Sequence, residues 1–160
     1  MSSVFDPNVF LDAIQTEVNE RRATIPQENP ADPNGLYTAM IGEIKPASGI
    51  ISKGERIGQP WLQVVVSLKL QLPPEVQALG LPPEFQITDR PMIDLTPQGS
   101  IDNAKGKNNA QRFYREATGT NKPGEPFALR MLQGKLIKVK LAHEIFRENV
   151  VEKVAGVFAA

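Results

Sequence analysis

Aromatic, amide and basic side chains alternate with aliphatic ones along residues 61–72, where the sequence reads WLQVVVSLKLQL. One side of the alternation is wholly Leu and Val, and the other carries Trp61, Gln63, Ser67 and Lys69. Side chains of these types can stack on flat rings, hydrogen-bond to polar edges and neutralise phosphate charge. The stretch is therefore a candidate binding surface, although the pattern also fits the solvated face of an ordinary half-buried strand.

Further basic and aromatic residues are predicted to join this surface from other parts of the chain. They are Lys53 and Arg56 in a Gly-rich loop over 45–60, Arg90 in the third strand, and Lys138, Lys140, Phe146 and Arg147 in and after a later strand. A groove lined with such cations and aromatics would follow a phosphate backbone while bases stack on the rings. For the loop, a simple solvated hairpin connection remains the commoner interpretation.

The sequence motifs of enzymes are absent. His143 is the single histidine and cysteine does not occur, so paired imidazoles and thiolate ligands are excluded. Neither GxSxG nor GxxxxGK[ST] is present. Asp89, Asp94 and Asp102 could gather near one loop to hold Mg²⁺, but acids near turns more often cap the chain. We therefore expect no enzymatic activity, no metal site and no cofactor.

Composition places the chain among ordinary globular proteins, with room at 160 residues for one domain and an arm. The net charge of zero hides a segregation: residues 1–89 carry 6 basic and 11 acidic side chains, and residues 90–160 carry 12 and 7. The basic half is where a polyanion would bind. Neither a membrane-length apolar run nor a basic region followed by an apolar block is present, so we expect a cytosolic protein without a membrane partner.

Three segments are predicted along the chain. Asp6-Pro7 is a helix-start signal, and apolar residues at helical spacing after it predict an amphipathic helix over 7–22, within an amino-terminal segment 1–22. Residues 23–35 are rich in Pro and Asn and predict a linker. Residues 36–160 form the domain. The helix could pack on its own chain or grip another subunit or a partner protein.

The domain is predicted to contain five strands, over 36–44, 61–72, 85–95, 135–146 and 150–158, with a helix over 109–118 between the third and fourth. Gly42 predicts a bulge in the first strand, and Pro91 a bulge or edge position in the third. This succession is typical of the OB-fold, a small five-stranded Greek-key barrel. Such barrels bind ligands on the face of strands two and three, between two flanking loops.

The carboxy-terminal half resembles a group of small bacteriophage-encoded proteins related to OB-fold single-stranded DNA-binding proteins. The resemblance covers about residues 90–158 and rests on 94–102 (DLTPQGSID), 105–108 (KGKN), 115–117 (REA), 121–127 (NKPGEPF), 132–135 (LQGK), Val139 and His143-Glu144. It implies a non-enzymatic role in phage DNA replication or recombination, in the host cytoplasm. Such proteins usually end in an acidic tail that recruits partners, whereas this sequence ends GVFAA and has acids early, in Asp6, Asp12, Glu17 and Glu20. Either the amino-terminal helix takes over that role or the analogy fails there.

We therefore expect an OB-like barrel that binds single-stranded DNA by base stacking and phosphate contacts. Replication or recombination proteins, or further copies of the chain, would be additional partners through the amino-terminal helix. The alternative is a virion structural protein, such as a head-decoration or tail component. That protein would use the barrel as a rigid block and the arm to clasp its neighbours. The neutral net charge suits this alternative, and the segregated charge suits DNA binding.

Overall fold

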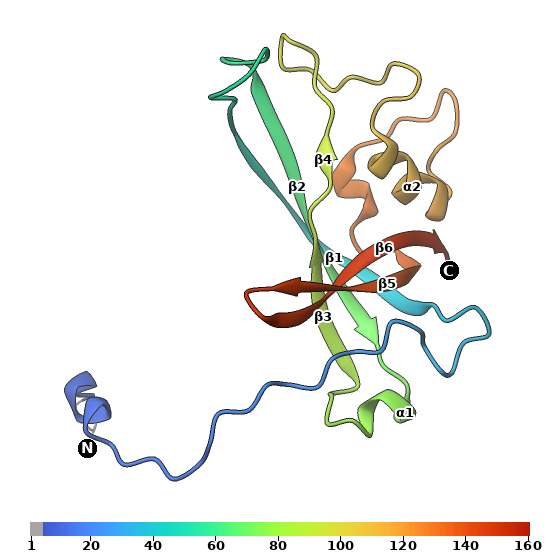
Figure 1. Cartoon of the computed structure of the whole chain (residues 1–160). Helices are drawn as coiled ribbons and strands as arrows, with labels where there is room; N and C mark the ends of the chain where they lie inside the picture. Colours follow the sequence, from blue (N-terminus) through green and yellow to red (C-terminus); the bar gives the residue numbers. More distant parts are fainter. Residues whose placement is uncertain (1–4) are drawn as a thin grey trace.

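Six antiparallel strands form one sheet in the computed structural model, which describes residues 5–160 (Figure 1). The strands are β1 (Tyr37–Ile50), β2 (Pro60–Gln71), β3 (Glu84–Asp89), β4 (Met92–Ile93), β5 (Leu136–Phe146) and β6 (Asn149–Ala159). Their order in the sheet is β3-β2-β1-β5-β6, and β4 pairs with β2. The prediction of a mainly β fold with few helices is therefore confirmed.

The alternation of apolar and polar residues along 61–72 appears directly in the burial of β2. Its even-numbered residues from Val64 to Leu70 are buried, and its odd-numbered residues remain at least partly exposed. The buried side joins one hydrophobic core with side chains of β1 and β5, among them Tyr37, Ile41, Ile137, Val139 and Leu141. Apolar residues at alternate positions thus place the polar side of β2 on the outer face of the sheet.

The first strand is longer than its sequence predicts. β1 continues to Ile50, so the connection to β2 shrinks to residues 51–59 and Lys45 lies on a strand rather than in a loop. The predicted bulge is present, because the register with β2 shifts between Ile41 and Ile44, on either side of Gly42. A Cβ at Gly42 would lie 3.4 Å from the carbonyl oxygen of Ser67, which is an ordinary contact distance.

Proline divides the predicted third strand into two. β3 ends at Asp89 and β4 begins at Met92, with Arg90-Pro91 between them. Pro91 has no N–H to donate, but its carbonyl oxygen accepts a hydrogen bond from the Val64 N–H at 2.9 Å, which keeps the interruption against β2. The sheet accordingly has six strands where five were expected.

Helices are short in the described part of the chain. α1 (Pro74–Gln77) links β2 to β3, α2 (Asn109–Ala117) lies between β4 and β5, and η2 (Leu129–Leu132) is a 3₁₀ turn. Tyr114 on α2 is buried and its hydroxyl donates to the Asp89 carboxylate at 2.6 Å, whereas Phe113 is about half exposed. Burial, with the Asp89 charge, raises the pKa of Tyr114. Tyr114, and not its neighbour Phe113, is therefore the aromatic residue that this helix contributes to the core.

The amino-terminal helix predicted over 7–22 is largely absent. The structure has a 3₁₀ turn, η1 (Pro7–Leu11), and no helix from residue 12 to 22. The start signal is correct, since Asp6 accepts a hydrogen bond from the Asn8 N–H at 3.0 Å. The apolar stripe after it meets no partner surface, and packing supplies most of a helix's stability. Residues 1–4 of this predicted segment lie outside the described residues. No helix within 5–160 is long and apolar enough to cross a membrane.

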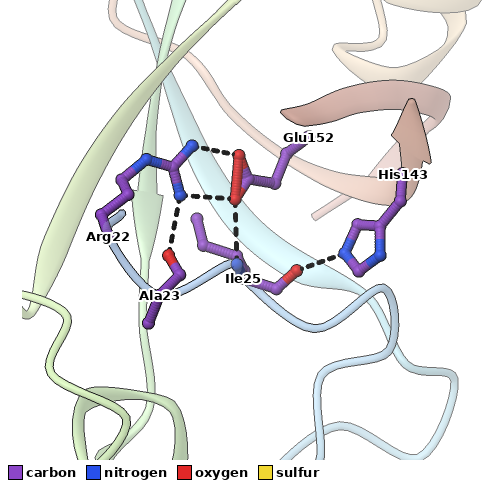
Figure 2. A network of polar contacts seen from close by, with 5 residues as sticks. All are labelled: Arg22, Ala23, Ile25, His143 and Glu152. Carbon is purple, nitrogen blue, oxygen red and sulfur yellow. Dashed lines mark hydrogen bonds and ion pairs between the residues drawn. The ribbon is translucent and has the colours of Figure 1, made fainter. Parts of the chain in front are cut away.

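Residues 23–35 contain no helix or strand, as predicted, but they begin on the sheet rather than free of it. Ile25 is fully buried, and its backbone N–H donates to the Glu152 carboxylate at 2.9 Å. Its carbonyl oxygen lies 2.7 Å from Nε2 of His143 (Figure 2). The Tyr37 hydroxyl donates to the carbonyl oxygen of Pro26 at 2.7 Å. The predicted linker is therefore part of the domain from its first residues.

Candidate nucleic-acid interface

A shallow groove of about 360 Å³ crosses the outer face of β1, β2 and β3. It is lined by Gly42, Glu43, Lys45, Val65, Ser67, Lys69, Gln86 and Thr88. Ser67 pairs with Thr88 and Lys69 with Gln86 across the β2–β3 ladder, so hydroxyl, amide and amine groups alternate along it. This arrangement offers hydrogen-bond donors and two cations to a ligand lying across the strands.

Both cations of the groove form ion pairs with exposed acids. Lys45 Nζ lies 3.5 Å from Glu43 and Lys69 Nζ lies 3.8 Å from Glu84, and all four side chains are more than half exposed. Ion pairs of this kind contribute little free energy in water. The two lysines can therefore exchange these partners for phosphate oxygens at small cost.

Trp61 lies on the same face, toward the hairpin end of β2. It pairs with Gly49 of β1, and a Cβ added at Gly49 would lie 2.7 Å from the indole Nε1. The indole therefore lies directly against the backbone of Gly49 and is partly buried. This contact covers part of the ring, so stacking with a base is restricted to what remains accessible.

Gln63, two residues along β2 from Trp61, contacts the backbone of Arg90. The Gln63 Nε2 donates to the carbonyl oxygen of Arg90 at 3.3 Å, and the Arg90 side chain is exposed. Lys53 and Arg56 lie in the β1–β2 connection, exposed and without an ion pair to any residue from 5 to 160. These four residues can extend the face from the groove toward the tip of the β1–β2 hairpin, at the upper left of Figure 1.

Lys138 and Lys140 lie on the same outer face of the sheet but outside the groove. Lys138 Nζ lies 3.4 Å from Asp32, and Lys140 lines a cavity of about 510 Å³ between β5 and residues 27–36. Hydrogen bonds from the backbone N–H of Leu36, together with Lys138, hold the pKa of Asp32 below its ordinary value despite partial desolvation. The two lysines therefore do not line the β1–β3 groove into which they were predicted to project.

Phe146 and Arg147 form the turn between β5 and β6. Arg147 has a φ of 48°, its guanidinium lies 5.2 Å from the Phe146 ring centroid, and the ring is more than half exposed. Residues 149–151 after this turn line a small cavity with Arg21 and Arg22. Phe146 and Arg147 thus form an accessible aromatic–cation pair, and its neighbours come from the amino-terminal segment.

The three aspartates considered for Mg²⁺ have separate structural roles. Asp89 accepts from Tyr114, Asp94 accepts from the Asn108 N–H at 2.7 Å, and Asp102 accepts from the Ala104 N–H at 3.0 Å. Within residues 5–160 no three His, Asp or Glu side chains gather as metal ligands. Asp94 and Asp102 thus cap loop backbone groups, and Asp89 holds the Tyr114 hydroxyl.

Lys45, Gln86 and Thr88 are among the groove residues that were not predicted from the sequence. Gln86 and Thr88 alternate along β3 on the same side, and this alternation was the signal that could have included them. Lys45 was assigned to a loop because Pro46 and Gly49 follow it. The β1 pairing that places Lys45 beside Val65 is a tertiary feature.

Comparison with known proteins adds no relative: no protein-family model and no curated protein matches this chain.

Proposed function

We propose that this protein binds single-stranded DNA across the outer face of β1, β2 and β3. The observation that carries the proposal is the polar groove with Lys45, Lys69 and Ser67, continued by Trp61 toward the β1–β2 connection. Amines for phosphates and a partly exposed indole for bases are the combination that sequence-independent binding requires.

The order of the strands supports an OB-like interpretation of the sheet. If β3 and β4 are counted as one strand interrupted at Pro91, five strands remain in the order third, second, first, fourth and fifth, with α2 between the third and fourth. In OB-folds this order brings the ligand to strands two and three and to the loops joining strands one to two and four to five. Here those loops carry Lys53 and Arg56, and Phe146 and Arg147.

The test is a titration of the full chain with oligo-dT, followed by Trp61 fluorescence at two salt concentrations. We expect quenching that weakens as salt rises, because phosphate contacts release counterions. The double variant Lys45→Gln, Lys69→Gln should bind more weakly and show a smaller salt slope. Lys153→Gln removes an exposed cation of β6 that lines none of the cavities described here and serves as the control. Unchanged fluorescence and unchanged binding by a second method would contradict the proposal.

A role in virion assembly is the second candidate, and the amino-terminal arm favours it. Residues 5–21 are exposed throughout and include apolar side chains from Val9 to Val18 that are 62 to 90% exposed. Apolar side chains left in water at this density are typical of segments that bind another protein surface. Sedimentation of the full chain and of a chain lacking residues 5–21 separates the two: an assembly that needs the arm, without oligo-dT binding, favours the structural role.

A further inference from the structure

A second polar cavity, of about 430 Å³, lies beside the first turns of α2. Its lining includes four cationic side chains, from Lys105, Lys107, Arg112 and Arg115, and no Asp or Glu. Like charges that face one cavity repel one another, and an anion between them removes that cost. The lining therefore favours a negatively charged ligand.

Gln111 supplies an independent indication that something binds there. It is only 6% exposed and lines the cavity, yet its side-chain amide forms no hydrogen bond with any residue from 5 to 160. Within residues 5–160, every fully enclosed side-chain N or O atom has a hydrogen-bond partner. The unpaired amide of Gln111 is therefore not fully enclosed and is open to the cavity that it lines. The amide is thus held at the cavity without a protein partner, and an oxygen-rich ligand would accept from its Nε2.

The loop that carries Lys105 and Lys107 is held in place by a hydrogen-bond network. Asn108 is buried, accepts from the Asp94 N–H at 2.7 Å, and donates to the carbonyl oxygen of Asp102 at 2.8 Å. The Asp94 and Asp102 carboxylates accept backbone N–H groups and are not among the lining residues. The network fixes the loop while its carboxylates are kept out of the cavity.

Arg115 is held in place by residues that follow α2 in the chain. Its Nε and Nη2 donate to the carbonyl oxygen of Thr120 at 3.3 and 3.0 Å, and its guanidinium lies 4.2 Å from the Phe127 ring centroid. Arg112 has a single ion pair, to Glu116 at 4.0 Å, with both side chains about half exposed. Arg115 is therefore pre-positioned, and Arg112 has only half-exposed partners, Glu116 and the Phe113 ring, that it can exchange for a ligand.

We propose that this cavity binds a phosphate group of a phosphate ester. Guanidinium groups and amines are the preferred protein partners of phosphate, and a fixed loop reduces the entropy lost on binding. The volume falls within the range of small-molecule sites, about 300–1,000 Å³, and exceeds what a bare ion needs. The proposal does not depend on DNA binding at the β1–β3 groove.

The experiment is an NMR titration of the ¹⁵N-labelled full chain with inorganic phosphate and then with dTMP, at constant ionic strength. We expect saturable shifts of the Gln111 side-chain amide and of the backbone of residues 103–108, with dTMP binding more tightly. Lys107→Gln with Arg112→Gln, both at exposed positions, should weaken binding about tenfold or more. Lys45→Gln with Lys69→Gln is the matched control and should leave these shifts unchanged.

Oligo-dT without terminal phosphates identifies the source of the phosphate. If it shifts the same signals, the cavity binds the phosphates of a strand; if only dTMP does, the cavity binds a free monoester. Three results would overturn the proposal. They are the absence of saturable shifts, equal shifts at lysines over the whole surface, and unchanged phosphate affinity in the Lys107/Arg112 double variant. Phosphate binding without oligo-dT binding would reject the proposed function and leave this site standing.

Discussion

Arg22 and Glu152 form a two-pronged ion pair that ties the amino-terminal segment to β6 (Figure 2). Nη1 of Arg22 donates to Oε2 at 2.8 Å and Nη2 donates to Oε1. The same guanidinium lies 4.7 Å from the ring centroid of Phe85 on β3. Because β3 and β6 are the two ends of the strand order, Arg22 contacts both edges of the open sheet. Residues 22–27 thus link the two edges of the sheet, and we call this segment the strap.

Replacing Glu152 by Gln should destabilise the domain. The Glu152 side chain is almost wholly buried and accepts from both Arg22 and the Ile25 N–H, so the variant loses the charge that serves both donors. We expect a loss of about 1–3 kcal/mol in the free energy of unfolding, measured in urea. Glu144→Gln on β5, which removes an exposed carboxylate, is the control. Equal stability of the two variants would show that the strap contributes nothing to folding.

The strap should also weaken in acid. Burial alone would raise the pKa of Glu152, but the hydrogen bonds from Arg22 and the Ile25 N–H outweigh it and hold the pKa below the ordinary 4.5. A lowered carboxylate pKa means that the stabilisation is complete above pH 4.5 and is lost as pH falls through the folded-state value. Urea unfolding at several pH values should show this loss, with a shallower dependence in Glu152→Gln. The lowered pKa of Asp32 acts in the same direction and remains in that variant. A parallel pH dependence in both proteins would contradict the assignment to Glu152.

Ile25 should behave as a core residue although its neighbours in sequence are those of a linker. Its side chain is fully buried, so Ile25→Ala should cost about 2–5 kcal/mol in urea unfolding, through lost burial and the cavity left behind. Ile14→Ala is the matched control, because Ile14 is 90% exposed on the arm. It should change the unfolding free energy by less than about 0.5 kcal/mol. Equal costs for the two would mean that residues 22–27 do not pack as described.

The sheet was predictable where a local pattern repeats, and the strap was not. Alternation along 61–72 and 135–146 places Leu68 and Val139 in the core because a strand has only two faces. The residues around Ile25 show no periodic pattern of apolar side chains, because the Pro and Asn residues there specify turns. Its burial depends on Glu152 and His143, more than 115 residues away in the chain. Contacts over such separations leave no local signal.

The arm and α2 show two further limits of sequence patterns. Phe10, Ile14 and Val18 have helical spacing, but an amphipathic stripe requires a surface to cover, and the structure offers none to it. On α2, Tyr114 is buried and Phe113 is not, because Asp89 accepts the phenolic hydrogen. Of the candidate site, Ser67 and Lys69 were predictable from alternation. The ion pair of Lys138 with Asp32 was not predictable, because residues 23–35 bring Asp32 to it from a distant part of the chain.

Gly49 should control the position of the Trp61 ring. A Cβ at Gly49 would lie between 2.7 and 2.9 Å from three atoms of the indole, closer than side-chain atoms approach. In Gly49→Ala the indole must therefore move away from β1, at a cost of about 1–3 kcal/mol if its neighbours resist. We expect shifted tryptophan emission in a folded protein. Trp61 is the single tryptophan, so the emission reports this ring alone.

The same variant separates two roles of the indole in DNA binding. If bases stack on Trp61 as it lies over Gly49, displacement of the ring should weaken oligo-dT binding, up to the effect of Trp61→Ala, about 1–3 kcal/mol. Gly54→Ala, in the β1–β2 connection at a site with no atom within 4 Å, is the control for changes to the hairpin. Its φ of +89° makes alanine strained there, so its fold must be verified by circular dichroism. If Gly49→Ala binds oligo-dT with unchanged affinity although its tryptophan emission is altered, the indole covers the β1–β2 hairpin and does not contact the DNA.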